Sequence, residues 1–261
     1  MKTLKVATYN VNSLRSRLPV VLDWLKKEKP DVLALQETKV TDDQFPGKAF
    51  EAAGWNATFK GQKIHHGVAV VSKKPVNDPV LSLYPGDPEA QARFIGFEYA
   101  GVKIFNTYIP QGTLIGTPQY EKKLKFFSDL KAYFKKHLSP QTPALWVGDL
   151  NVAQEEIDLA RPAGNRDHVC FHIDARNALK SAMDGLWFDL FREKEKGAGH
   201  YTFWSQRFGD TFKKNVGWRV DLILGTRPML SRLKKIWIDK KPREKKGASD
   251  HTFVAAEFAG I

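Results

Sequence analysis

The chain has 261 residues, enough for one large domain or two small ones, and its 42% hydrophobic and 27% charged residues are typical of a globular protein. No stretch approaches the ~18 consecutive apolar residues of a membrane span, and the N-terminus turns polar by Asn10, before a secretory apolar segment could form. Cys170 is the only cysteine, which excludes an internal disulfide framework and a multi-cysteine zinc site. We therefore expect a cytoplasmic protein, associated with the nucleoid if prokaryotic, with no membrane partner.

The chain is strongly basic, with 41 Lys and Arg against 29 Asp and Glu and a net charge of +12. Residues 205–246 hold 13 of these cations and only four acidic residues, and so contribute +9. A concentrated positive segment favours a polyanionic partner such as nucleic acid. Composition alone fits a lysine-rich protein without such a partner equally well, so the motifs must decide.

The first elements predicted along the chain are a strand, a helix and a second strand. Residues 4–11 and 31–36 are apolar runs that end in polar residues, as expected for buried strands. Between them, apolar residues at helical spacing predict a helix that has Pro19 in its first turn and ends before Pro30. Further strands are predicted at 67–72, 93–99, 102–109, 144–148, 219–224 and 252–258.

A long helix is predicted over about 118–137, with one apolar stripe and with lysines that we assign to a solvated outer face. A shorter helix is predicted at 173–184. The segments expected to form loops are 41–65, 84–92, 154–171 and 205–217. No linker or repeat divides the chain, so we expect a single domain over residues 1–261. Because strands outnumber helices, a mixed α/β sandwich is favoured over an all-parallel doubly wound sheet.

Several predicted strands end in carboxylates or carboxamides: Asn10 and Asn12, Glu37, Asp149 and Asn151, Asp221, and Asp250 followed by His251. A buried strand has no structural need for a polar end, so convergence of these ends would place several carboxylates in one cleft. Crowded carboxylates repel one another unless a cation or hydrogen bonds compensate. Oxygen ligands of this kind favour a hard metal ion such as Mg²⁺.

Seven short segments together resemble the exonuclease III family of DNA repair nucleases, within the endonuclease/exonuclease/phosphatase superfamily. In chain order they are Tyr9-Asn10-Val11-Asn12, Leu35-Gln36-Glu37-Thr38-Lys39, His66-Gly67-Val68-Ala69, Asn106-Thr107-Tyr108-Ile109-Pro110, Gly148-Asp149-Leu150-Asn151-Val152-Ala153, Gly217-Trp218-Arg219-Val220-Asp221 and Ser249-Asp250-His251. Each segment alone is a weak signal, but their order and spacing are specific, and the resemblance covers nearly the whole chain. It implies a four-layered α/β sandwich with two packed, mainly antiparallel (mixed) β-sheets flanked by helices.

The resemblance implies a metal site. Glu37 matches the family's metal-binding glutamate, and Asn10 lies beside it as a direct or indirect ligand. Asp250 would either contact the metal, through water, or tune His251, and both interpretations stay open. The implied ion is Mg²⁺, with Mn²⁺ as a substitute, and one-metal and two-metal arrangements would use the same ligands.

The resemblance also implies a set of catalytic residues. Asp149 matches the aspartate that orients or deprotonates the attacking water, and Asn151 would hold that water or a phosphate oxygen. His251 matches the histidine at the scissile phosphate, and Asp221 matches the aspartate that fixes its orientation. Tyr108 matches a tyrosine whose hydroxyl reaches a phosphate oxygen. The implied reaction is in-line attack of water on a phosphodiester phosphorus.

The flanking segments must identify the substrate, because DNase I-like nucleases, inositol polyphosphate phosphatases and sphingomyelinases share this catalytic core. The segments 201–204 and 215–219 resemble those that supply aromatic walls for a flipped-out baseless sugar in abasic-site nucleases. The residues expected to contact DNA are Arg93, His168, Phe203, Trp218 and Val220.

We therefore expect a monomeric, Mg²⁺-dependent base excision repair nuclease that hydrolyses double-stranded DNA on the 5′ side of abasic sites. It would also act at nicks and blocked 3′ ends, as a 3′→5′ exonuclease or 3′-phosphatase. A non-catalytic nucleic-acid-binding module is disfavoured because a pure DNA binder avoids concentrated carboxylates in its groove. A phospholipid or phosphoinositide phosphodiesterase is disfavoured by Trp218 and the aromatic segment 201–204. The balance among these activities, including RNase H-like activity, depends on loop shape.

Overall fold

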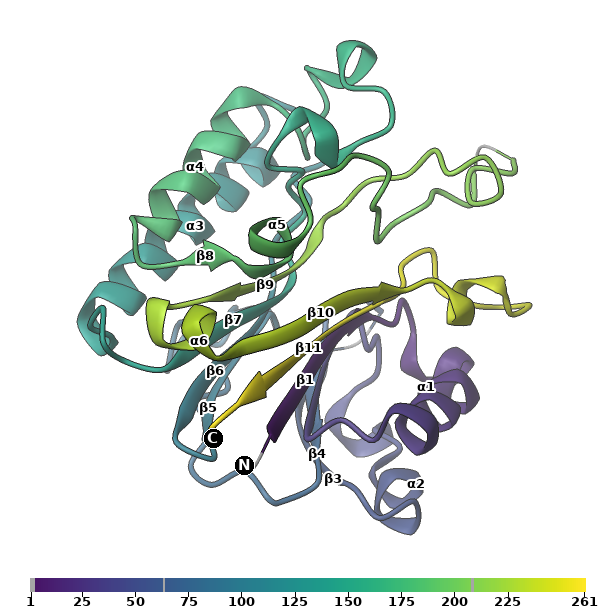
Figure 1. Cartoon of the computed structure of the whole chain (residues 1–261), viewed down its shortest axis with the longest axis vertical. Coiled ribbons are helices and arrows are strands. Elements are labelled where there is room, and N and C mark those ends of the chain that lie inside the picture. The colour runs from purple at the N-terminus through teal and green to yellow at the C-terminus, as the bar shows by residue number, and fades with distance from the viewer. Residues whose placement is uncertain (1–2, 63, 208) are drawn as a thin grey trace.

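The computed structural model describes residues 3–62, 64–207 and 209–261, which form two β-sheets packed face to face (Figure 1). The first sheet contains, in spatial order, β10 (Leu233–Asp239), β11 (Phe253–Ala259), β1 (Thr3–Asn10), β2 (Val32–Gln36), β4 (Val68–Ser72) and β3 (Asn56–Lys60). The second contains β5 (Phe94–Tyr99), β6 (Val102–Tyr108), β7 (Ala144–Asp149), β9 (Asp221–Gly225) and β8 (Phe188–Asp189). Each sheet has one parallel pair, β1–β2 and β6–β7, and its other neighbours are antiparallel.

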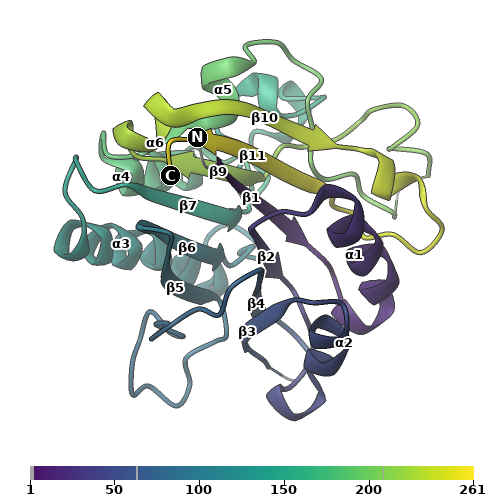
Figure 2. The ribbon, with the colours of Figure 1, turned by 60° about the horizontal axis from the view of Figure 1, so that its bottom comes forward.

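Helices cover the outer faces of both sheets and complete four layers (Figures 1 and 2). The first sheet is covered by α1 (Leu14–Glu28) and α2 (Gly47–Ala52), and the second by α3 (Pro118–His137) and α4 (Ile173–Met183). The short helices α5 (Leu190–Lys194) and α6 (Arg227–Arg232) contact strands of both sheets. Single 3₁₀ turns lie at Asp42–Gln44, Glu156–Asp158, Ala163–Asn165 and Lys241–Glu244. The predicted four-layered sandwich of mainly antiparallel mixed sheets is confirmed. None of the helices described is long and apolar enough to cross a membrane.

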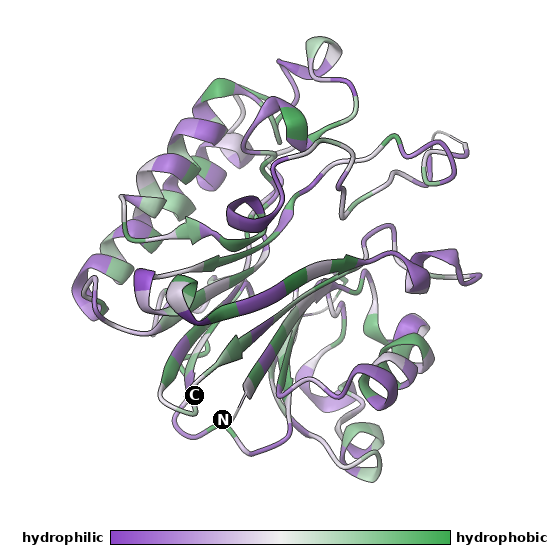
Figure 3. Cartoon of the chain, in the orientation of Figure 1, coloured by the Kyte–Doolittle hydropathy of each residue, from purple (hydrophilic) through white to green (hydrophobic). Residues whose placement is uncertain are grey.

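Burial on both faces explains why the central strands are continuous apolar runs. In β1, Leu4 and Val6 pack between the sheets, whereas Ala7 and Tyr9 pack on the outer side beneath α1. The hydropathy view shows the same contrast, with largely apolar strands and helices that alternate between apolar and polar residues (Figure 3). The core therefore consists of one apolar layer between the sheets and one beneath each pair of helices.

Several sequence-based boundaries are wrong. The first helix begins at Leu14, so Pro19 lies in its interior instead of in its first turn, at the cost of one backbone hydrogen bond. The expected loop 41–65 contains α2 and β3, and β9 begins at Asp221, two residues after the predicted start of the strand at residue 219. The strand β10 and the short elements β8, α5 and α6 were not predicted. Tertiary pairing stabilises such short elements more than their local pattern does.

The lysines of α3 do not all lie on its solvated face. Lys123 is completely buried, whereas the apolar residues Tyr120, Phe127, Leu130 and Phe134 pack against the second sheet as expected. Burial of a lysine requires acceptors for its ammonium group.

A buried ion network supports the segment that leads into β9. Arg219 donates to Asp158 from Nε at 2.8 Å and to Asp189 from Nη2 at 2.7 Å, while Arg192 Nη2 lies 2.6 Å from Asp158. Burial alone would raise the pKa of Asp158, but the two guanidinium groups outweigh it and lower that pKa. The network joins a 3₁₀ turn, α5 and the chain just before Asp221.

Asp158→Asn should lower the free energy of unfolding at pH 7 by about 3–5 kcal/mol, because it removes the carboxylate paired with Arg192 and one of the two carboxylates paired with the buried Arg219. The folded pKa of Asp158 lies below its unfolded value of about 3.9, so this contribution is present above that value and is lost as the pH falls through the folded pKa. Urea denaturation at several pH values measures both effects. Glu156→Gln, which breaks an exposed pair with Arg166, is the control and should change little. An equally small loss for Asp158→Asn would contradict this account.

Candidate active site

The polar strand ends predicted from the sequence meet at one end of the two sheets. In the first sheet Asn10 is in register with Gln36, the last residues of the parallel strands β1 and β2. In the second sheet Tyr108 is in register with Asp149, and Asp149 with Asp221 at the start of β9. Strand register therefore brings these side chains to the same end of the sandwich.

Left-handed backbone turns follow the strands and aim the side chains of the site. Glu37 has φ 52° and Asn151 has φ 50°, values that are uncommon for residues other than glycine. Gly148 has φ 139°, and a Cβ atom there would lie 1.9 Å from the carbonyl oxygen of Thr107. The glycine before Asp149 is therefore required by the close approach of β6 and β7.

Asn10 connects the two sheets at the site. Its Nδ2 group donates to Glu37 Oε1 at 2.9 Å and to Asp149 Oδ2 at 2.8 Å. Its Oδ1 atom accepts from the backbone of Asn12 at 3.1 Å, which fixes the orientation of the amide. One buried side chain thus sets the relative position of two carboxylates from different sheets.

Glu37 is held as an anion by three donors. Tyr108 donates its hydroxyl to Oε1 at 2.8 Å, in addition to the bond from Asn10, and Lys39 Nζ lies 2.8 Å from Oε2. Burial on its own would raise the pKa of Glu37, but the bonds from Asn10 and Lys39 outweigh it and lower the pKa to about 2. Burial and the neighbouring charge of Glu37 raise the pKa of Tyr108 well above its ordinary value, so its hydroxyl remains a donor.

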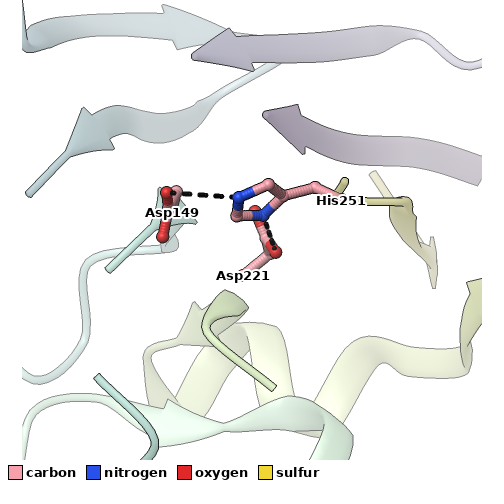
Figure 4. A group of neighbouring side chains, drawn as sticks. All are labelled: Asp149, Asp221 and His251. Carbon is pink, nitrogen blue, oxygen red and sulfur yellow. Dashed lines mark hydrogen bonds and ion pairs between the residues drawn. The ribbon is translucent and has the colours of Figure 1, made fainter. Parts of the chain in front are cut away.

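His251 lies between two aspartates (Figure 4). Its Nδ1 atom is 2.8 Å from Asp221 Oδ2, and its Nε2 atom is 4.0 Å from Asp149 Oδ2. Burial alone would lower the pKa of His251, but the Asp221 carboxylate outweighs it and raises the pKa to about 10. The imidazole is therefore a cation at neutral pH, with an N–H available at Nε2.

Asp149 is buried among donors and other carboxylates. Asn151 donates to it from its backbone at 2.9 Å and from Nδ2 at 3.2 Å. Burial raises the pKa of Asp149 and the negative charges of Asp221 and Glu37 add to this rise, while the His251 cation opposes it. A buried carboxylate with a raised pKa is a suitable proton acceptor near neutral pH.

The donor set fits a hard metal ion. Glu37 supplies an anionic carboxylate, and the buried Asp221 Oδ1 atom has no hydrogen-bond partner among the described residues. Possible ligand atoms of Asp149, Asp221 and His251 also lie within 4.8 Å of one another. A metal held by His251 would have to displace the proton of an imidazole already paired with Asp221, so Glu37 is the better centre for a metal.

Asp250 is connected to Glu37 through two intervening side chains, Asn12 and Lys39. Its Oδ1 atom accepts from Asn12 Nδ2 at 2.9 Å and from Ser249 Oγ at 3.3 Å. Asn12 in turn accepts from Lys39 Nζ at 2.6 Å. A chain of polar side chains thus connects Asp250 with Glu37, and the two roles predicted for Asp250 both remain predictions.

Of the residues predicted to contact DNA, His168 is exposed, Phe203 and Trp218 are half-buried, and two are buried. Half-buried Phe203 lies 4.9 Å from the His251 ring, and half-buried Trp218 lies 4.7 Å from His168, both measured between ring centroids. Backbone hydrogen bonds join Phe203 to Trp218, so these aromatic rings border the site. Val220 is buried.

Arg93 is also buried, and its guanidinium lies 4.5 Å from the Tyr108 ring centroid. Its Nη1 group donates to the Tyr108 carbonyl at 3.0 Å, and its Nε group to Gln91 at 2.6 Å. These contacts fix the strand end that carries Tyr108. A phosphate contact by Arg93 stays a prediction.

Sequence reasoning missed several residues that support the site. Lys39 and Ser249 lie within the motifs quoted above, yet no role was assigned to them, and Asn12 was expected at the cleft only as a polar strand end. Ser249 donates from Oγ to the Asn10 carbonyl at 2.8 Å and accepts from the His251 backbone at 3.2 Å. Their position inside the motifs is the sequence feature that could have identified them as part of the site. Trp204, which lies in the segment 201–204 that resembles an aromatic wall, is a fully buried core residue.

Comparison with known proteins identifies the family. The family model described as "Endonuclease/Exonuclease/phosphatase family" matches residues 7–251. The chain belongs to the endonuclease/exonuclease/phosphatase family. The "Exodeoxyribonuclease III" of Haemophilus influenzae is 30% identical over 98% of this chain and 100% of its own length. The "DNA-(apurinic or apyrimidinic site) endonuclease" of Dictyostelium discoideum is 35% identical over 88% of this chain, which spans 64% of that longer relative.

Solved structures of this family agree closely with the fold. An AP endonuclease from Archaeoglobus fulgidus is 39% identical and has a TM-score of 0.95, covering 98% of this chain and 100% of its own. A variant of the 3′ phosphatase NExo from Neisseria, bound to a product DNA hairpin, is 32% identical with a TM-score of 0.93 and the same coverage. The family membership predicted from the seven motifs is confirmed.

Asp221→Asn should lower the pKa of His251 from about 10, because burial is then opposed by the charges of Asp149 and Asp250 without that of Asp221. In the wild-type protein the imidazole should lose its proton only as the pH rises through about 10. NMR titration of the ring nitrogens in the metal-free protein measures both values. The exposed His137 serves as an internal control and should titrate alike in both proteins. Wild-type titration of His251 near pH 6.5 would contradict the ion pair.

Proposed function

We propose that this chain is a Mg²⁺-dependent DNA repair nuclease that hydrolyses the phosphodiester bond 5′ to abasic sites and also removes nucleotides or phosphates at 3′ ends. The observation that carries this proposal is the junction of Glu37, Asp149 and the Asp221–His251 pair across two sheets, bordered by aromatic rings. The relatives support it, since they include an abasic-site endonuclease, an exodeoxyribonuclease III and a 3′ phosphatase bound to DNA.

In this mechanism His251 stabilises the reacting phosphate. Its protonated ring directs the Nε2–H group into the site, while Asp221 holds the other nitrogen at 2.8 Å. A cationic donor fixed before the reaction stabilises negative charge as it develops on the phosphate oxygens. Asp221 therefore acts through His251 by keeping it charged and oriented.

Asp149 would orient the attacking water and accept its proton. Its raised pKa makes it a suitable base, and Asn10 and Asn151 fix the directions of its oxygens. The Tyr108 hydroxyl, which bonds Glu37 in this structure, would donate to a phosphate oxygen. A water held between Asp149 and the phosphate would then lie opposite the leaving 3′ oxygen.

Glu37 would hold the metal ion, with Asn10 and Asp250 as its neighbours. Mg²⁺ at this position would supply Lewis-acid stabilisation of charge on the phosphate and the leaving oxygen. The low pKa of Glu37 keeps the carboxylate ionised, and Lys39 compensates its negative charge by pairing with the Oε2 atom. Mn²⁺ has similar ligand preferences and would substitute.

The DNA would bind as a duplex to a monomer across the edge where these residues meet. The basic segment 205–246 includes the loop that follows Phe203 and Trp204, which places positive charge beside the site for phosphate contacts. Half-buried Phe203 and Trp218 would form the walls for a sugar that lacks its base, next to His168. Trp218 also packs on Leu159 and Phe171, so it has both a core side and an open side.

Glu37→Gln should reduce turnover by about a hundredfold or more at limiting Mg²⁺ and raise the Mg²⁺ concentration needed for half-maximal activity, because an anionic ligand is lost. The variant should keep the fold, because the strand end contributes little packing, but its Tm should fall because the buried ion pair with Lys39 is lost. Assays of 3′-phosphate removal across a Mg²⁺ series measure the effect. Glu98→Gln, an exposed carboxylate on β5, is the control. If the Mg²⁺ dependence of Glu37→Gln is unchanged, Glu37 does not hold the metal ion.

Trp218→Ala should reduce incision at an abasic analogue by roughly ten- to a hundredfold, because an apolar wall of this kind contributes about 1–3 kcal/mol. Removal of a 3′-phosphate at a nick should fall much less, since that reaction inserts no baseless sugar. Trp237→Ala, a half-buried tryptophan on β10, is the matched control. Equal loss of both activities together with a lower Tm would show that Trp218 serves only the core.

A further inference from the structure

Lys123 places a buried ammonium group directly behind the active-site loops. Its side chain is fully buried on α3, and its Nζ atom donates to three backbone carbonyls. The acceptors are Gln111 at 3.1 Å, Asn151 at 2.8 Å and Val169 at 2.6 Å. No carboxylate of the described residues pairs with it at ion-pair distance.

Three carbonyl acceptors require three N–H donors, which a lysine has only as the ammonium ion. Burial lowers the pKa of Lys123, and the negative charge of Asp149 is among the effects that oppose this. A buried cation without a carboxylate partner is costly, so a leucine or methionine would be the simpler choice for packing alone. The hydrogen bonds that its ammonium group donates to three backbone carbonyls therefore explain why a lysine occupies this buried position.

The three carbonyls belong to three separate loops of the site. Gln111 follows Tyr108 at the end of β6, Asn151 follows Asp149 at the end of β7, and Val169 follows His168. Two of these loops also bond each other, through Ala153 N to the Cys170 carbonyl at 2.8 Å and Cys170 Sγ to Asn151 Oδ1 at 3.7 Å. Lys123 bonds all three loops through their backbone carbonyls, and the Asn151 side chain adds a bond to the Ile109 carbonyl at 3.0 Å.

We propose that Lys123 is a positioning residue for phosphodiester hydrolysis, which fixes the left-handed turn at Asn151 and thereby the Asp149 and Asn151 side chains. This inference rests on the proposed function and extends it. Asn151 keeps φ 50° while its carbonyl oxygen accepts a hydrogen bond from the buried ammonium of Lys123, its one donor among the residues that the structure describes. Without that donor the turn would relax and misplace the groups that hold the attacking water. A misplacement of about 1 Å costs on the order of a hundredfold in rate.

Lys123→Met tests the proposal because it keeps the length of the side chain and removes all three donors. The expected result is a fall in kcat of roughly ten- to a hundredfold for 3′-phosphate removal, with KM for the duplex within about threefold of wild type. Amide hydrogen exchange should become faster at 150–155 and 167–172. Lys135→Met removes the same charge from the exposed last turn of α3 and should change neither measurement.

A folded Lys123→Met protein with wild-type kcat and exchange rates would overturn the proposal. If this variant does not fold, Lys123→Gln, which retains two N–H donors, is measured in the same way, with the same expected split between kcat and KM. If neither variant folds, Lys123 is required for folding alone, and this result would also overturn the proposal. A wild-type protein without nuclease activity would count against the proposed function, and the exchange rates would then decide the positioning role.

Discussion

The whole site depends on the two hydrogen bonds of the Asn10 amide. Its one Nδ2 group donates to Glu37 from the first sheet and to Asp149 from the second, so the spacing of these carboxylates depends on how the two sheets pack. Ser249 bonds both the Asn10 backbone and the His251 backbone, which adds the segment just before β11 to the same junction. The sandwich therefore serves as the frame for a single cluster of charges.

Charge compensation explains why so many ionisable groups can be buried together. Glu37 is paired with Lys39, and His251 lies between Asp221 and Asp149. These pairs move the pKa values of Glu37 and His251 away from neutral pH, which keeps one anionic and the other cationic. Their states are thus fixed before a substrate binds, so little reorganisation is needed during the reaction.

The sequence allowed the sandwich and the carboxylate–histidine cluster to be predicted, because buried strands that end in polar residues leave a clear local pattern. Asn10, Glu37, Asp149, Asp221 and His251 were all found in this way or through the motifs. Lys123 was not, since a lysine among other lysines on an amphipathic helix has no local signal of burial. Arg93 likewise has no sequence feature that would place it beneath Tyr108. The short strands β3 and β8 arise from pairing with neighbours distant in the chain.

Incision of a duplex with one abasic analogue is the most direct test of the central claim that the two sheets build a metal-dependent phosphodiester hydrolase. The strand should be cut once, on the 5′ side of the analogue, leaving a 3′-hydroxyl. EDTA should abolish the cut and added Mg²⁺ should restore it. No incision at enzyme excess, or incision that persists in EDTA, would contradict the account.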